Sequence, residues 1–78
     1  MNQSEAIEKI QTELARAKCI HPRFPAISVI SMVAIMAEEA GEAIKAANDV
    51  IYKGESTSNL KSELIQTGAM VLRCLENL

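Results

Sequence analysis

Two short acidic stretches contain the residues of this chain that are best suited to chemistry. The first is Glu38-Glu39-Ala40-Gly41-Glu42 and the second is Glu63-Leu64-Ile65-Gln66. Each lies inside a segment whose apolar residues recur at helical spacing. Burying an unpaired carboxylate is costly, so three carboxylates within five residues of an apolar helix need a metal ion, basic partners or water.

Helical geometry allows these side chains to converge. Residues three or four apart lie on one face of an α-helix, so Glu39 and Glu42 are neighbours, and Glu38 is also adjacent to Glu42. Glu63 and Gln66 have the same three-residue spacing. Two such helices packed antiparallel would direct both pairs into one pocket of oxygen ligands, as a hard divalent cation requires. We expect Mg²⁺, because it retains water ligands and is usually completed by substrate phosphates.

The alternative for the same residues is a solvated helix face with ordinary surface salt bridges. Pairs such as Glu42–Lys45 or Asp49–Lys53 would then be surface contacts. An E-x-x-E spacing on one helix favours this alternative when taken alone. The matching pair on the second segment leaves the metal site and the solvated face equally supported by residue chemistry.

Three helices are predicted to hold these residues. The first runs from about Ser4, its predicted N-cap, to Lys18, and the prolines of the His21–Pro25 segment end it. The second runs from about Ser28 to Tyr52 and ends at Gly54. The third runs from about Leu60 to the C-terminus. No segment alternates with the period of a strand, so the predicted fold class is all-α.

The apolar residues of the second and third helices predict which sides are buried. The second helix has a broad apolar surface, which is typical of a central helix that packs on more than one side. This surface includes Val29, Val33, Met36, Ala40, Ala47 and Ile51. The predicted buried side of the third helix consists of Leu64, Gly68, Val71, Leu72 and Leu75.

Length and composition together predict an assembly of several copies. The chain has 78 residues, which form a single domain, residues 1–78, and 49% of them are hydrophobic. A monomer of this size buries only about 60–65% of its unfolded surface. We therefore expect a small three-helix unit that completes a helical bundle by oligomerisation, as a homodimer or a homotetramer.

Charge and hydropathy exclude several classes of function. The formal net charge is -2 and no block of like charge occurs, so the chain has no electrostatic footprint for nucleic acid. The apolar stretch around Ala26–Ala37 is too short for a membrane span, and the polar N-terminus is unlike a signal peptide. Cys19 and Cys74 lack metal-type spacing and are expected to be reduced thiols, which indicates a cytoplasmic protein.

The two acidic stretches together resemble a known family. The pattern EE-x-x-E on one helix and E-x-x-D on the next is that of the MazG-like all-α nucleotide pyrophosphohydrolases. The flanking stretches AIMAEEAGEAIKAAND and SELIQTGAMVLRCLENL are similar to those of small MazG-like proteins, and the resemblance spans Ile27–Leu78. The first half of the pattern matches fully. In the second half, Gln66 stands where the family has an aspartate.

This resemblance implies Mg²⁺-dependent cleavage of nucleoside triphosphates to monophosphates and pyrophosphate by metal-activated water. It implies that Glu39, Glu42 and Glu63 are magnesium ligands, with Gln66 at the fourth ligand position. A glutamine carbonyl can coordinate magnesium but supplies no charge. Glu38, the leading acid of the motif, would hold a second ion or orient the attacking water, which is a catalytic role.

Residues outside the motif suggest further contacts with the substrate. Lys45 and Arg73 are candidate phosphate contacts, for which surface solvation or ion pairing is the alternative. Asn48 is a candidate base contact, or else an ordinary polar residue near a helix end. Phe24 would either stack on a base or anchor its loop to the core.

The second hypothesis for the whole chain is a non-catalytic helical interaction module, or a nucleotide-binding regulatory module whose metal site is degenerate. The substitution of glutamine for aspartate at Gln66 favours it.

Overall fold

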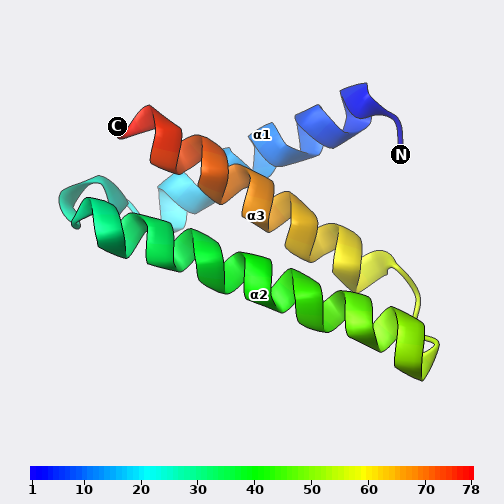
Figure 1. The fold of residues 1–78 in the computed structure, drawn as a ribbon. Helices are drawn as coiled ribbons and strands as arrows, with labels where there is room; N and C mark the ends of the chain where they lie inside the picture. The colour runs from blue at the N-terminus through cyan, green and yellow to red at the C-terminus, as the bar shows by residue number, and fades with distance from the viewer.

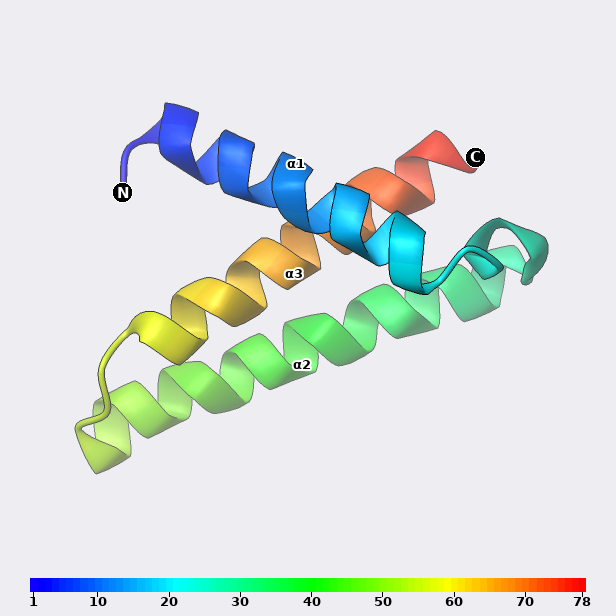
Figure 2. The same cartoon turned by 180° about the vertical axis from the view of Figure 1, so that it is seen from behind.

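Three α-helices and one short 3₁₀ helix make up the computed structural model, which describes residues 1–78 and contains no strand. They are α1 (Gln3–Ile20), η1 (Phe24–Ala26), α2 (Val29–Lys53) and α3 (Ser58–Glu76). The predicted all-α class is therefore confirmed. Helices α2 and α3 form an antiparallel hairpin, and α1 crosses α3 on one side of it (Figures 1 and 2). None of the helices combines the length and the apolar character needed to cross a membrane.

The helix ends follow the capping residues in the sequence. The Ser28 hydroxyl accepts a hydrogen bond from the Ser31 N–H (3.1 Å) and caps α2, and Gly54 ends that helix in the left-handed conformation with φ of 65°. The start near Ser28 and the end at Gly54 are as predicted. The prediction of Ser4 as the first N-cap is wrong, because the Asn2 side chain accepts from the Glu5 N–H at 2.8 Å and starts α1 earlier.

Helix α3, rather than α2, is the central element. It contacts both α1 and α2, so the prediction of α2 as a helix packed on several sides is wrong for the single chain. Ala43 and Ala46 of α2 and Ala69 of α3 are buried, and such small side chains let neighbouring helices approach closely. Where α1 crosses α3, a Cβ added at Gly68 would lie 2.9 Å from Ile10 Cδ1, so glycine allows this approach without displacing the Ile10 side chain.

The large apolar residues predicted to be buried on α2 and α3 are mostly exposed. On α2 these are Val29, Val33 and Ile51, and on α3 they are Leu64, Val71, Leu72 and Leu75. The hairpin closes instead through a different side of each helix, which contains Met32, Ala43, Ala46, Ala69 and Cys74. Single-chain packing therefore uses the smaller side chains and leaves larger ones facing outward.

A small core holds the turn between α1 and α2 in place. Phe24 of η1 packs with Met32 of α2 and Cys74 of α3, and all three are buried. The expectation that Phe24 anchors its loop to the core is confirmed. The Cys74 thiol also donates to the Met32 carbonyl (3.6 Å), and both cysteines are free thiols, as expected.

The Arg73 guanidinium joins α3 to the C-terminal end of α1. Only 2% of Arg73 is exposed. Its Nη1 donates to the Ala17 carbonyl (3.0 Å) and its Nη2 donates to the His21 carbonyl (2.6 Å). Its guanidinium carbon also lies 4.6 Å from the centre of the Phe24 ring. A cation is favoured here, because the last carbonyls of a helix are unpaired and carry partial negative charge.

Replacement of Arg73 by methionine is expected to lower the free energy of unfolding by about 2–4 kcal/mol, because two carbonyls lose their donor. Chemical denaturation measures this change. Arg23→Met is the matched control, since Arg23 is exposed and close in sequence to the same turn. Equal losses in the two variants would contradict the role given to Arg73.

Candidate metal centre

Three carboxylates from two helices converge on the side of the hairpin that faces α1. Glu39 and Glu42 come from α2 and Glu63 comes from α3, and each offers an oxygen within 4.8 Å of the others. Glu39 and Glu63 are half-buried and Glu42 is exposed, so the cluster opens to solvent. The antiparallel pairing of α2 and α3 creates this convergence, because it brings the middle of α2 beside the first half of α3.

Gln66 completes the cluster through its side-chain amide. With Nε2 turned toward the carboxylates, it donates to Glu39 Oε2 at 3.0 Å and to Glu63 Oε2 at 3.3 Å. In the opposite orientation the amide oxygen would face only these acceptors. Gln66 therefore links the two helices across the cluster and hydrogen-bonds two carboxylates in the absence of a cation.

The cluster is electrostatically strained without a cation. Partial burial, followed by the charges of Glu42, Glu13 and Glu38, raises the pKa of Glu39 above its ordinary value. The pKa of Glu63 is also raised, by partial burial, by a hydrogen bond with Glu42 and by the Glu42 and Glu39 charges. The environment thus disfavours the ionised form of both groups, and a bound cation would reverse that preference.

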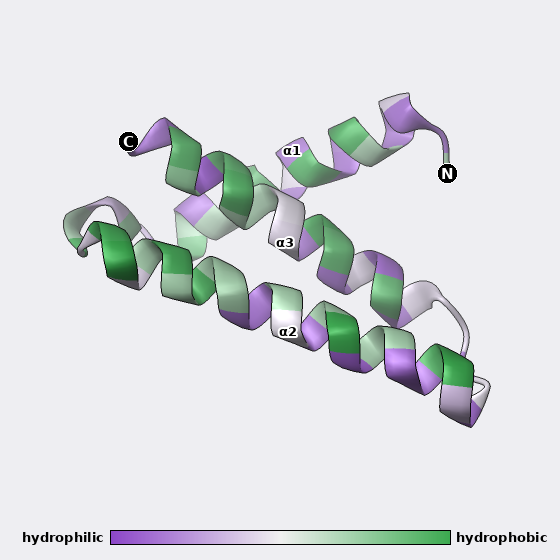
Figure 3. Cartoon of the chain, viewed as in Figure 1, coloured by the Kyte–Doolittle hydropathy of each residue, from purple (hydrophilic) through white to green (hydrophobic).

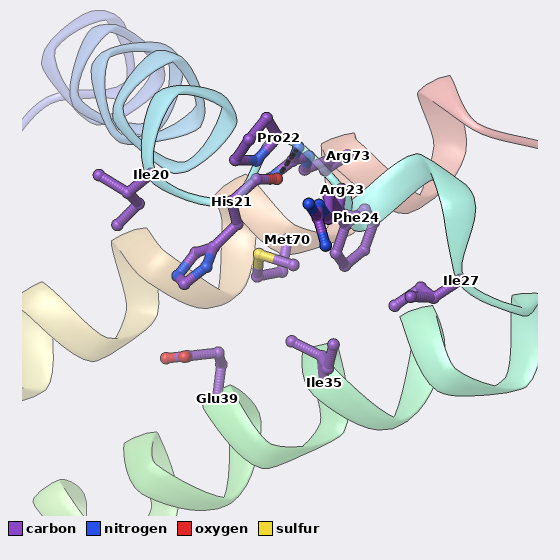
Figure 4. A pocket seen from close by; sticks show the side chains of 10 residues that line it. All are labelled: Ile20, His21, Pro22, Arg23, Phe24, Ile27, Ile35, Glu39, Met70 and Arg73. Carbon is purple, nitrogen blue, oxygen red and sulfur yellow. Dashed lines mark hydrogen bonds between the residues drawn. The ribbon is translucent and has the colours of Figure 1, made fainter.

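A hollow of about 440 Å³ adjoins the cluster and shares Glu39 with it (Figure 4). Its walls come from the end of α1, the turn that follows it, α2 and α3. The apolar lining consists of Ile20, Phe24, Ile27, Ile35 and Met70, and the polar lining includes His21, Arg23 and Arg73. This volume lies within the usual range for sites that bind small molecules.

The remaining predicted site residues lie at different distances from the cluster. Glu38 is exposed beside it, and Lys45 is exposed one turn beyond Glu42. Asn48 follows Glu39 by nine residues and therefore lies about half a turn away around α2, on the other side of the helix. The substrate contacts assigned to Lys45 and Asn48, and the catalytic role of Glu38, stay predictions.

Arg73 reaches the hollow but not the cluster. Its two terminal nitrogens donate to backbone carbonyls, and its buried Nε has no hydrogen-bond partner. The geometry therefore gives Arg73 a structural role in the wall of the hollow, and the phosphate contact assigned to it also stays a prediction.

Sequence reasoning missed the contribution of α1 to the site. Glu13 and Arg16 form a two-point ion pair, with nitrogen–oxygen distances of 2.9 and 2.7 Å. Both line a smaller hollow of about 90 Å³ together with Glu39 and Gln66. The hydrogen bond from Arg16 lowers the pKa of Glu13, which keeps that carboxylate ionised beside Glu39. One signal was available: Glu13 lies next to Leu14 on the buried side of its helix.

The raised pKa values predict how metal-free stability depends on pH. A carboxyl group with a raised pKa in the folded state contributes stability below its ordinary pKa, and loses it as pH rises through the raised value. We expect the metal-free protein to melt a few degrees higher near about pH 5 than near about pH 7. The difference should shrink in Glu39→Gln.

Thermal unfolding in EDTA at both pH values measures this effect, and Glu8→Gln, at an exposed position of α1, is the control. A Glu39→Gln variant with the same pH dependence as the wild type would show that the cluster carboxylates are not the cause.

Comparison of the chain with models of protein families, with curated proteins and with solved structures found no match. What the site can do therefore rests on the chemistry of its own residues.

Proposed function

We propose that the protein is a MazG-like nucleotide pyrophosphohydrolase that cleaves nucleoside triphosphates to monophosphates and pyrophosphate with Mg²⁺. The observation that carries the proposal is the convergence of Glu39, Glu42 and Glu63 within 4.8 Å, at the edge of a hollow large enough for a nucleoside. The sequence pattern EE-x-x-E and E-x-x-Q supplies these same residues.

The donor set fits a magnesium ion. Each of its ligand atoms is an oxygen, and Glu39, Glu42 and Glu63 provide these oxygens as carboxylates. Desolvation and mutual repulsion raise the pKa values of Glu39 and Glu63, and this cost is removed when a divalent cation is present. On an ordinary solvated helix face, like-charged carboxylates spread apart into the water. Here three carboxylates from two helices lie within 4.8 Å of one another.

Each residue of the cluster then has a defined task. Mg²⁺, when bound, supplies an activated water and neutralises the charge that develops on the phosphates. Glu39, Glu42 and Glu63 hold the ion through their carboxylates. Gln66 rotates its amide so that the oxygen replaces the nitrogen toward the centre. Glu38, exposed beside them, orients the attacking water or holds a second ion.

The hollow beside Glu39 is proposed to receive the base and sugar. Its apolar side chains offer the flat, dry surface on which a base packs, and Phe24 and Met70 contribute to this lining. His21 and Arg23 come from the turn after α1, and Figure 4 shows this turn across the hollow from Glu39. The triphosphate would then extend from the hollow toward the carboxylates.

Pyrophosphate release from a panel of deoxyribonucleoside and ribonucleoside triphosphates tests the proposal. We expect release with Mg²⁺, none with EDTA, and at least a hundredfold loss in Glu39→Gln, because a metal ligand is removed. Glu8→Gln should keep wild-type activity. A folded protein that releases no pyrophosphate from any nucleotide would contradict the proposal and favour the non-catalytic binding module.

Replacement of Gln66 by aspartate separates its two tasks. The metal-free protein should lose about 1–3 kcal/mol of stability, because two hydrogen bonds are exchanged for one more negative charge. Magnesium should then raise the melting temperature more than it does in the wild type, since a fourth carboxylate binds the ion.

Thermal unfolding with EDTA and with Mg²⁺ measures both effects of this substitution, and Gln11→Asp on the exposed side of α1 is the control. Equal magnesium-induced shifts in wild type and Gln66→Asp would remove Gln66 from the proposed ligands.

A further inference from the structure

The smaller hollow, of about 90 Å³, lies beside the carboxylate cluster between α1 and the hairpin. Glu13 and Arg16 line it from α1, Glu39 lines it from α2, and Gln66 lines it from α3. It adjoins the larger hollow of about 440 Å³, because the two have four lining residues in common, which are Ile20, His21, Glu39 and Met70. The smaller hollow therefore extends the larger one toward Gln66 and the cluster.

Glu13 and Arg16 differ from the other charged residues of α1 in their position. Figure 3 shows hydrophilic residues along the length of this helix. The remaining charged residues of α1 line neither hollow, and they are Glu5, Glu8, Lys9 and Lys18. The Arg16 side chain is 56% exposed and the Glu13 side chain is 18% exposed. The guanidinium is thus accessible to a dissolved ligand, while the carboxylate that holds it is largely covered.

The ion pair uses only part of the Arg16 guanidinium. Its Nε donates to Glu13 Oε2 at 2.9 Å, and its Nη2 donates to Glu13 Oε1 at 2.7 Å. A guanidinium has five N–H donors, so both hydrogens of Nη1 and one of Nη2 stay free. Glu13 therefore fixes the plane of the guanidinium and leaves a set of donors suited to phosphate oxygens.

We propose that the free N–H groups of Arg16 bind phosphate oxygens of the nucleoside triphosphate, and that Glu13 positions the guanidinium for this contact. The inference rests on the proposed function, in which the triphosphate extends from the larger hollow to the carboxylates. The smaller hollow lies on that path, because Glu39 borders both hollows and belongs to the cluster.

The charge of the site favours such a contact. The cluster of Glu39, Glu42 and Glu63 is acidic, and Glu13 adds a further carboxylate near Glu39. A triphosphate brings more negative charge than one Mg²⁺ ion neutralises. Basic side chains that bind the phosphates supply the remaining compensation at sites of phosphoryl chemistry. A cation beside Glu39 therefore lowers the electrostatic cost of bringing the phosphates to the carboxylates.

Arg16 is better placed for this role than the other basic residues near the site. Arg73 lines the larger hollow, but both of its terminal nitrogens donate to backbone carbonyls. Arg23 lines the larger hollow alone, and Lys45 lines neither hollow. Arg16 is thus the one permanent cation in the lining of the smaller hollow.

Calorimetric binding of inorganic tripolyphosphate with Mg²⁺ tests the proposal without requiring turnover. We expect Arg16→Gln to raise the dissociation constant about tenfold, because charge-assisted hydrogen bonds to phosphate are lost. Arg16→Lys should recover part of the affinity, since it keeps the charge but lacks the planar fork. Lys9→Gln is the matched control. It removes the same charge from an exposed position of α1 that lines neither hollow, so it should bind like the wild type.

The same titration tests the positioning role of Glu13. Glu13→Gln should weaken binding about threefold although it removes a negative charge, because the guanidinium loses its two-point partner. If Glu13 acted through its charge alone, its removal would strengthen binding of an anion. Tighter binding by Glu13→Gln would therefore overturn the positioning role.

Equal dissociation constants for the wild type and Arg16→Gln would overturn the proposal and leave the ion pair as an ordinary surface contact. A wild type that binds no tripolyphosphate would overturn it as well. Pyrophosphate release from nucleoside triphosphates is a separate readout. Release by a wild type whose binding does not depend on Arg16 would overturn this inference alone. Arg16-dependent binding without release would support this inference and contradict the proposed hydrolysis.

Discussion

The buried guanidinium of Arg73 determines where the N-terminal part of the chain lies. It donates to the carbonyls of Ala17 and His21 and packs against Phe24, so a single side chain of α3 fixes the end of α1 and the turn that follows. These elements form most of the wall of the hollow beside Glu39. The shape of the hollow thus depends on a contact between residues more than fifty positions apart in sequence.

The two sides of the hairpin differ in chemical character. One side brings carboxylates together at a cost in stability, as the raised pKa values of Glu39 and Glu63 indicate. The other side exposes large apolar residues that a single chain leaves without a partner.

The three helices and the convergence of the acidic side chains could be predicted from the sequence. Periodicity predicted all three helices, and helical spacing on two antiparallel helices correctly predicted that Glu39 and Glu42 would meet Glu63 and Gln66. It misassigned the buried sides, because hydropathy gives weight to leucine and isoleucine, whereas close packing of the hairpin favours alanine. The burial of Arg73 had no local signal, because its carbonyl partners belong to a distant helix end.

The side-chain amide of Gln66 has a consequence for how the hairpin is held together. Its nitrogen donates to Glu39 of α2 and to Glu63 of its own helix, so one neutral side chain bridges two carboxylates that would otherwise repel each other. An aspartate at this position would leave four carboxyl groups facing one another. Gln66 thus acts as a neutral polar cross-link between α2 and α3 at the point where the acidic residues of the two helices are closest.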